Sequence, residues 1–304
     1  MSILISIIGS GRVGSAIAFL IASNSLDDIV LVNRTKNKAV GEALDISNSI
    51  PGNSSISIHG TNDFAEINNS EVIVITASAG TYSQSRTELV SDQINMSRQI
   101  IKNLKDVPTN SKILIVSNPV DVLTYVFHKE SHFPHEKILG IASSLDSSRF
   151  RLLLSRELSS DQSDISDAIV LGEHGDTMVP IFSRAKKTNT PVLELLNNEQ
   201  IDSITGDLRF YWKTLREYKS RSVFGISKNV YDVLEAITKN KEISIPSSTL
   251  LNGEYGFSDV CLGVPTVISK DGLKEIQEIK LSDIELEKFH RSVDSVKNDI
   301  KDSI

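Results

Sequence analysis

Short apolar runs rich in β-branched residues alternate with amphipathic stretches through the first half of this 304-residue chain. A short, nearly continuous apolar run is typical of a strand buried on both faces, whereas apolar residues at helical spacing indicate a helix with one buried face. Regular alternation of the two predicts a parallel sheet with right-handed crossovers and helices on both sides. The predicted strands are 3–8, 29–32, 72–76, 113–116 and 138–141, and the predicted helices are 13–22, 36–47, 88–104 and 120–128.

The pattern changes after about residue 142, where helices and strands no longer alternate regularly. Asp146 can cap the first of these later helices, and Ser282 and Glu285 can form a capping box for the last. The sequence therefore predicts an α/β fold in which a doubly wound parallel sheet (1–143) precedes an α+β domain (144–304). The later elements are predicted as helices 146–158, 199–219, 228–238 and 282 onward, and strands 168–171, 243–251, 257–262 and 266–268.

Composition narrows the class of protein. The chain is 39% apolar and 23% charged, with a net charge of −7, which is typical of a soluble globular protein and disfavours nucleic acid as its main ligand. Cys261 is the sole cysteine, so no intrachain disulfide can form. The apolar N-terminal run has no basic residues before it, and no apolar stretch is long enough to span a membrane. We therefore expect a cytoplasmic protein that binds neither membranes nor nucleic acids.

A glycine-rich turn connects the first predicted strand to the first predicted helix. Its G-x-G-x-x-G spacing permits a tight turn, close approach of a pyrophosphate to the backbone, and close packing of helix on sheet. The helix N-terminus would add free N–H groups and a positive dipole end. This context predicts a Rossmann-type dinucleotide site, with cofactor contacts from Gly9, Ser10, Gly11, Arg12, Val13 and Gly14.

The end of the second strand bears on the choice of cofactor. An acidic residue usually stands there and binds the adenosine ribose, but this chain has Asn33 followed by Arg34. An aspartate would repel a 2′-phosphate, whereas asparagine is neutral and the adjacent guanidinium can pair with that phosphate. We therefore predict NADP(H) as the cofactor, with NAD(H) as the alternative.

Two short segments carry the groups needed for acid–base chemistry on a carboxylic acid. His174 can accept a proton near neutral pH, and Asp146 can fix its tautomer and stabilise the imidazolium. Arg149 lies three residues after Asp146, so both would share one helix face, and its planar fork suits a bidentate grip on a carboxylate. These residues predict the oxidation of a small 2-hydroxy acid.

These motifs, in this order and spacing, resemble the lactate/malate dehydrogenase superfamily, and the overall pattern is similar to archaeal malate dehydrogenases. The resemblance extends from the first strand almost to the last helix. It rests on the glycine turn and on the segments 117–121 (SNPVD), 145–150 (LDSSRF), 172–176 (GEHGD) and 251–256 (LNGEYG).

The resemblance implies roles for further residues. Asn118 would bond the reacting oxygen and help to seat the nicotinamide, and Arg86 would polarise the substrate carbonyl. Gln93 stands at a helix position that is usually asparagine in the family, which weakens its match as a cofactor contact. The family commonly forms dimers or tetramers, so a homodimer or homotetramer is expected. The cofactor contacts implied after the second strand are Thr76, Ala77, Ser78, Gln93, Val116, Ser117 and Asn118.

The segment from Ser78 to Arg86 matches the family's mobile active-site loop, and it departs from the malate pattern. Relatives selective for malate usually carry an arginine about six residues before Arg86, whereas the nearest residues here are Gly80 and Thr81. Arg221 is a possible replacement cation. Malate and oxaloacetate are the expected substrates. The alternatives are lactate or another 2-hydroxy acid and, more remotely, a catalytically silent cofactor-binding paralogue.

Two further clusters are interpreted without assigning a function to them. The histidines His128, His132 and His135 lack a supporting carboxylate or cysteine cluster, so they are predicted to be solvated surface residues and no metal is expected. The aromatic run 210–212 is predicted to lie in the core or an interface.

Overall fold

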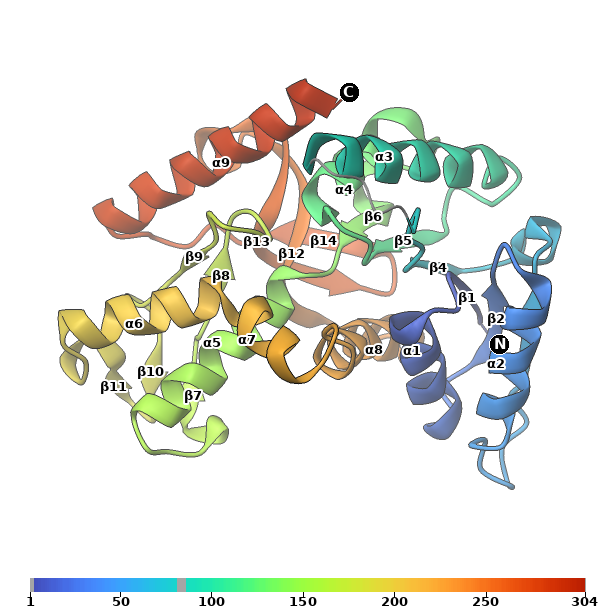
Figure 1. Cartoon of the computed structure of the whole chain (residues 1–304), viewed down its shortest axis with the longest axis horizontal. Helices are drawn as coiled ribbons and strands as arrows, with labels where there is room; N and C mark the ends of the chain where they lie inside the picture. Colours follow the sequence, from blue (N-terminus) through green and yellow to red (C-terminus); the bar gives the residue numbers. More distant parts are fainter. Residues whose placement is uncertain (1–2, 81–85, 304) are drawn as a thin grey trace.

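The computed structural model describes residues 3–80 and 86–303, and the side chains among them except those of 86–89 and 303. These residues form a nine-stranded sheet of order β14-β13-β12-β6-β5-β4-β1-β2-β3 (Figure 1). The six strands from β6 to β3 are parallel, and β12, β13 and β14 continue the sheet antiparallel. Their bounds are β1 Leu4–Ile8, β2 Asp28–Val32, β3 Ile58–Thr61, β4 Val72–Ile75, β5 Lys112–Ile115, β6 Ile138–Gly140, β12 Ile243–Asn252, β13 Ser258–Ser269 and β14 Gly272–Ile276.

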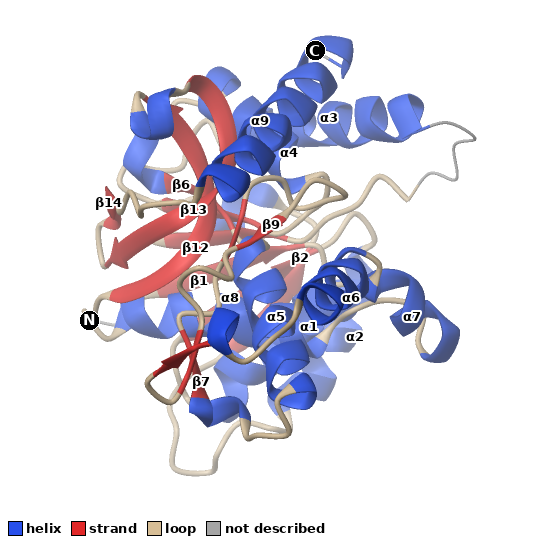
Figure 2. Ribbon diagram, turned by 90° about the vertical axis from the view of Figure 1, so that its left-hand side faces the viewer, coloured by secondary structure: helices blue, strands red, loops and turns tan. Residues whose placement is uncertain are grey.

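Helices cover both faces of the parallel part, because successive side chains of each strand point to opposite faces. In β4, Val74 packs with helices α1, α2 and α8, whereas Ile75 packs with α3 and α4 on the other face. The helix α9 lies beside α3 (Figures 1 and 2). The doubly wound prediction is thus confirmed. These helices are α1 Arg12–Ser23, α2 Lys36–Ser47, α3 Arg86–Asn103, α4 Val120–Glu130, α8 Phe224–Thr238 and α9 Asp283–Ser303.

A second core lies outside the large sheet. Phe150 and Leu154 of α5 pack there against Phe182 and against Ile204 and Leu208 of α6. Short strands surround this core, in one sheet of three and one pair. The bounds are α5 Ser143–Glu157, α6 Asn198–Arg209, β7 Ile165–Ser166, β8 Val170–Leu171, β9 Val179–Pro180, β10 Lys186–Lys187 and β11 Thr190–Pro191.

The predicted elements of the first half agree with the structure to within about two residues at each end, but β3 was not predicted. The strand β3 is too polar to be recognised in the sequence as a buried strand, because three of its four residues are His59, Gly60 and Thr61. In the second half, β14 and the short strands β7, β9, β10 and β11 were not predicted either. The runs 257–262 and 266–268 were predicted as two strands and form one, β13. The strand is continuous because β12 pairs with it from Val260 to Ile268, and Gly263 also bonds to Gly172 through its N–H and C=O, at 3.0 and 2.8 Å.

Two predictions about the later helices are wrong, and a third is confirmed. The region 199–219 is not one helix, because α6 ends at Arg209 and a separate helix α7, Tyr211–Tyr218, begins after Phe210. Asp146 does not cap α5, which already begins at Ser143. Its carboxylate bonds to side chains instead of the helix backbone. The capping box of α9 is confirmed by bonds from Ser282 N–H to the Glu285 carboxylate at 2.9 Å and from Glu285 N–H to Ser282 Oγ at 3.4 Å.

One surface prediction also needs correction. His128 is half-buried and not solvated, and burial, with the nearby His135, lowers its pKa to about 3. Phe210 and Trp212 are 42% and 41% exposed, so of the two places predicted for the aromatic run, the core is excluded and an interface stays a prediction. Among the described residues, no helix has the length and apolarity that a membrane crossing requires.

Candidate active site

The glycine turn lies where the strand order reverses, between β1 and β4. In a doubly wound sheet this is the point where the carboxyl ends of two strands open a crevice for a ligand. Gly9 has φ +113°, and a Cβ there would lie 2.7 Å from Ala77 N. A Cβ on Gly14 would collide with the Gly9 carbonyl, whereas Gly11 faces open space at the N-terminus of α1. The turn is therefore packed tightly on two sides and open on the side where a phosphate can approach.

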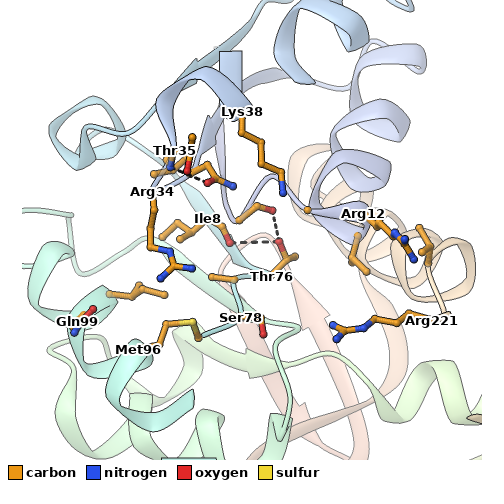
Figure 3. A pocket seen from close by; sticks show the side chains of 18 of the residues that line it. Ile8, Arg12, Arg34, Thr35, Lys38, Thr76, Ser78, Met96, Gln99 and Arg221 are labelled. Atoms are coloured by element: carbon orange, nitrogen blue, oxygen red, sulfur yellow. Dashed lines mark hydrogen bonds between the residues drawn. The ribbon is translucent and has the colours of Figure 1, made fainter. Parts of the chain in front are cut away.

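A cavity of about 810 Å³ extends from this turn. It is large enough for a nucleotide ligand. Arg34 and Lys38 reach it from the end of β2 and the start of α2, and Arg221 points in from the opposite side (Figure 3). Arg12 of the turn donates a hydrogen bond to Ser220, which ties the turn to the segment before α8. Of the predicted cofactor contacts, those that line the cavity are Gly9, Gly11, Arg12, Val13, Asn33, Arg34, Thr76, Ala77 and Ser78.

Asn33 and Arg34 have different surroundings. The Asn33 amide donates to Ser10 Oγ at 3.0 Å and accepts the Thr35 N–H at 3.0 Å, so its side chain braces the turn between β2 and α2. Arg34 has no ion pair among the residues that the structure describes, and its guanidinium extends into the cavity (Figure 3). An unpaired guanidinium beside a neutral amide is suited to an anionic group on the ligand.

The other predicted contacts lie behind the cavity wall or beside it. Ser10 is buried, and Gly14 packs under the turn. Gln93 accepts the Ala79 N–H at 3.2 Å, and Ser117 Oγ donates to the Ala77 carbonyl at 2.6 Å. Both side chains therefore hold the segment after β4 in place. Val116 bonds through its N–H to Ile75, and Asn118 is exposed at the carboxyl end of β5.

Arg86 is the first residue of α3, but its side chain falls outside the described part of the chain, as do residues 81–85 of the predicted loop. Sequence reasoning assigned only Gln93 of α3 to the cofactor and missed the α3 residues that line the cavity, because an amphipathic helix does not reveal which of its residues border a ligand. The additional residues that line the cavity from α3 are Met96, Gln99, Ile100 and Asn103.

The buried carboxylate of Asp146 connects the other two predicted residues of the cluster, His174 and Arg149. Asp146, which is 1% exposed, has its Oδ2 2.5 Å from His174 Nδ1, and its Oδ1 accepts from Arg149 Nη1 at 3.0 Å. The helix α5 places Asp146 and Arg149 one turn apart, while His174 comes from the segment after β8. The side chains of His174 and Arg149 are 16% and 11% exposed, so each keeps a limited opening toward a ligand.

The electrostatics of this cluster favour a protonated imidazole. Burial lowers the pKa of His174, but the charge of Asp146 and its hydrogen bond outweigh burial, so the pKa is raised above the ordinary value. A carboxylate in the same low-dielectric site stabilises the imidazolium more than water would. The cluster can therefore take up a proton and hold it next to a bound acid.

Asp121 is a site residue to which sequence reasoning assigned no role, although it belongs to the 117–121 motif. Its Oδ2 accepts the backbone N–H of His174 at 2.8 Å, and its Oδ1 accepts from Ser248 Oγ at 2.6 Å. It thereby connects α4 and β12 to the segment that carries the imidazole. Burial raises the pKa of Asp121 to about 6, and the bonds from Ser248 and His174 offset part of that rise.

Comparison with known proteins places this site in a family. Residues 3–140 match the model of the lactate/malate dehydrogenase NAD binding domain, and residues 143–304 match that of the lactate/malate dehydrogenase alpha/beta C-terminal domain. The chain therefore belongs to the lactate/malate dehydrogenase family, as its motifs predicted.

Individual relatives carry both names of the family. A malate dehydrogenase from Staphylococcus carnosus is 37% identical over 310 residues, covering 99% of this chain and 97% of the relative. An L-lactate dehydrogenase from Halalkalibacterium halodurans is 33% identical, covering 97% of this chain and 95% of the relative. The solved lactate dehydrogenase of Cryptosporidium parvum, complexed with lactic acid and nicotinamide adenine dinucleotide, superposes with a TM-score of 0.93 at 32% identity, covering 99% and 98% of the two chains.

Proposed function

We propose that this protein is a nicotinamide-dependent dehydrogenase that interconverts malate and oxaloacetate. The observation that carries the proposal is the carboxylate of Asp146 bonded to both His174 and Arg149, in a fold whose switch point holds a nucleotide-sized cavity. On this proposal residues 1–143 bind the cofactor and residues 144–304 supply the groups that act on the substrate.

The chain's own residues account for the proton and for the orientation of the acid. When bound, the cofactor supplies the hydride acceptor for substrate oxidation. His174 takes the hydroxyl proton on its Nε2, because Nδ1 is committed to Asp146. Arg149 grips the substrate carboxylate with the donors that Asp146 leaves free. Asn118 and Arg86 are proposed to bind the reacting oxygen, as in the family.

We also propose that NADP(H) is the preferred cofactor, with NAD(H) as the alternative. The proposal is supported by the unpaired Arg34 guanidinium, by Lys38 in the same wall, and by the neutral Asn33. Steady-state kinetics with each cofactor test it. A KM for NADPH below that for NADH supports the proposal, and the reverse order contradicts it.

The malate assignment is tested against the alternative of lactate or another 2-hydroxy acid. The alternative is favoured by the absence of an arginine at Gly80 and Thr81 in the sequence. Arg221 lines the dinucleotide cavity beside Arg12, where it is as well placed for phosphates as for a second carboxylate. Turnover of oxaloacetate, pyruvate and a bulkier 2-oxo acid should be compared with both cofactors. A large preference for pyruvate would contradict the malate proposal, and no turnover of any of them would favour a catalytically silent paralogue.

A cytoplasmic location and assembly into a homodimer or homotetramer complete the proposal. Both come from the sequence and its family resemblance. Light scattering of the purified protein measures the assembly directly, and a monomeric mass would contradict it.

A further inference from the structure

The guanidinium of Arg149 has a second neighbour besides Asp146. Its Cζ lies over the ring of Tyr211, 5.0 Å from the ring centroid. A guanidinium over an aromatic face is attracted to the negative potential of that face, and the attraction is larger where water is excluded. The Arg149 side chain is 11% exposed, so the contact with Tyr211 is largely shielded from water.

The two neighbours constrain different features of Arg149. The bond from Nη1 to Asp146 fixes one corner of the guanidinium but leaves rotation about that bond. The Tyr211 ring restricts this rotation because it attracts the face of the group. A carboxylate is recognised by the N–H donors along the edge of a guanidinium, so an aromatic ring over the face does not compete with it.

Tyr211 is held at this position by the helix that precedes it. It is the first residue of α7 and directly follows Phe210, the residue between the end of α6 and the start of α7. The helix α6 is anchored by buried Ile204 and Leu208, whereas no residue of α7 is buried. The next aromatic, Trp212, packs instead against Arg216, 4.8 Å from its ring, at the surface. Tyr211 is thus the α7 aromatic that reaches Arg149.

We propose that Tyr211 is a positioning residue that orients the Arg149 guanidinium for the substrate carboxylate. The inference rests on the proposed function, because it assumes that Arg149 binds the acid. An aromatic ring in this role makes substrate affinity depend on a side chain that need not touch the substrate. Loss of the ring should therefore weaken binding of the acid and leave cofactor affinity and the proton step unchanged.

The experiment compares Tyr211→Leu, Tyr211→Phe and the matched control Trp212→Ala. The Leu variant keeps an apolar side chain without a π face, and the Phe variant keeps the ring without the hydroxyl. We expect Tyr211→Leu to raise KM for oxaloacetate about tenfold with kcat nearly unchanged, and Tyr211→Phe to restore the wild-type KM. Trp212→Ala should match wild type.

Calorimetric titration of the enzyme–cofactor complex with oxalate gives a second readout that does not depend on turnover. Oxalate affinity should fall about tenfold in Tyr211→Leu and recover in Tyr211→Phe. Equal loss in the Leu and Phe variants, or no loss in either, would overturn the role of the ring. Absence of turnover and of oxalate binding in the wild-type protein would instead contradict the proposed function itself.

Discussion

The acid–base cluster and the dinucleotide cavity present their charges in opposite ways. In the cluster, His174 and Arg149 share the buried carboxylate of Asp146, so one counterion orients both side chains inside the protein. In the cavity, Arg34 and Arg221 point into space that a ligand can fill (Figure 3). The first arrangement fixes a reaction that requires a defined geometry. The second leaves charge available to select among ligands. Substitutions in the cluster should therefore change kcat strongly, whereas those in the cavity should change affinity modestly.

The largest effect is expected for His174→Ala. Without the imidazole the hydroxyl proton has no acceptor, and general acid–base catalysis contributes about 100- to 10,000-fold to a rate. We expect kcat to fall within that range while fluorescence titration shows unchanged cofactor affinity. Survival of turnover, or a loss of cofactor affinity as large as the loss of kcat, would contradict the role of His174 as the proton acceptor.

Asp146→Asn should have the next largest effect and should also alter the pH dependence. The carboxylate raises the pKa of His174, so the amide should lower it. Oxidation requires the neutral imidazole, so kcat/KM for the hydroxy acid rises as pH passes the pKa of His174. That rise should move to lower pH in Asp146→Asn, together with a decrease in kcat of about a hundredfold or more. An unshifted pH profile would contradict the electrostatic role of Asp146.

Asp121→Asn tests whether the buried carboxylate that holds the His174 backbone lowers the stability of the folded protein. Its pKa is about 6 in the folded protein, against an ordinary value of 3.8, because burial disfavours the charge. A raised carboxyl pKa means that the folded state binds the proton more tightly, so stability falls as pH rises from about 4 to about 6. Asp121→Asn removes that ionisation; its amide oxygen can still accept the His174 N–H, and its NH2 can donate to Ser248 Oγ, which reverses the second bond.

The measurement is the free energy of unfolding of wild type and Asp121→Asn at several pH values. Relative to the variant, wild type should lose about 2 kcal/mol between pH 4 and pH 6. A difference that stays constant over this range would show that Asp121 titrates normally.

Some site residues could be predicted because the sequence itself determines how they lie relative to one another. The glycine turn, Thr76 and Asn118 follow predicted strands, and the carboxyl ends of parallel strands meet at one edge of a sheet. Asp146 and Arg149 are neighbours on one helix turn. These residues are recognisable because the relation between them is local or is set by the strand order.

Asp121 and Tyr211 could not be assigned in this way. Asp121 meets the backbone of His174, 53 positions along the chain, and a backbone contact leaves no trace in the residue types. Tyr211 was grouped with Phe210 and Trp212, because a run of three aromatics does not show that the helix breaks at Phe210. The packing of α6 determines that Tyr211, and not its exposed neighbours, reaches Arg149, and this packing cannot be read from the residue types.

Arg34→Ala, in the dinucleotide cavity, should give the smallest effect. Arg34 has no ion pair among the described residues, so its removal leaves no buried charge uncompensated and should not change stability measurably. A surface-type contact with a phosphate contributes roughly 1–2 kcal/mol, so KM for NADPH should rise about tenfold while KM for NADH stays the same. Lys36→Ala is the matched control, because Lys36 begins α2 but does not line the cavity. A parallel rise in both KM values would show that Arg34 shapes the cavity in general, and an unchanged NADPH KM would leave Lys38 as the cation that selects the cofactor.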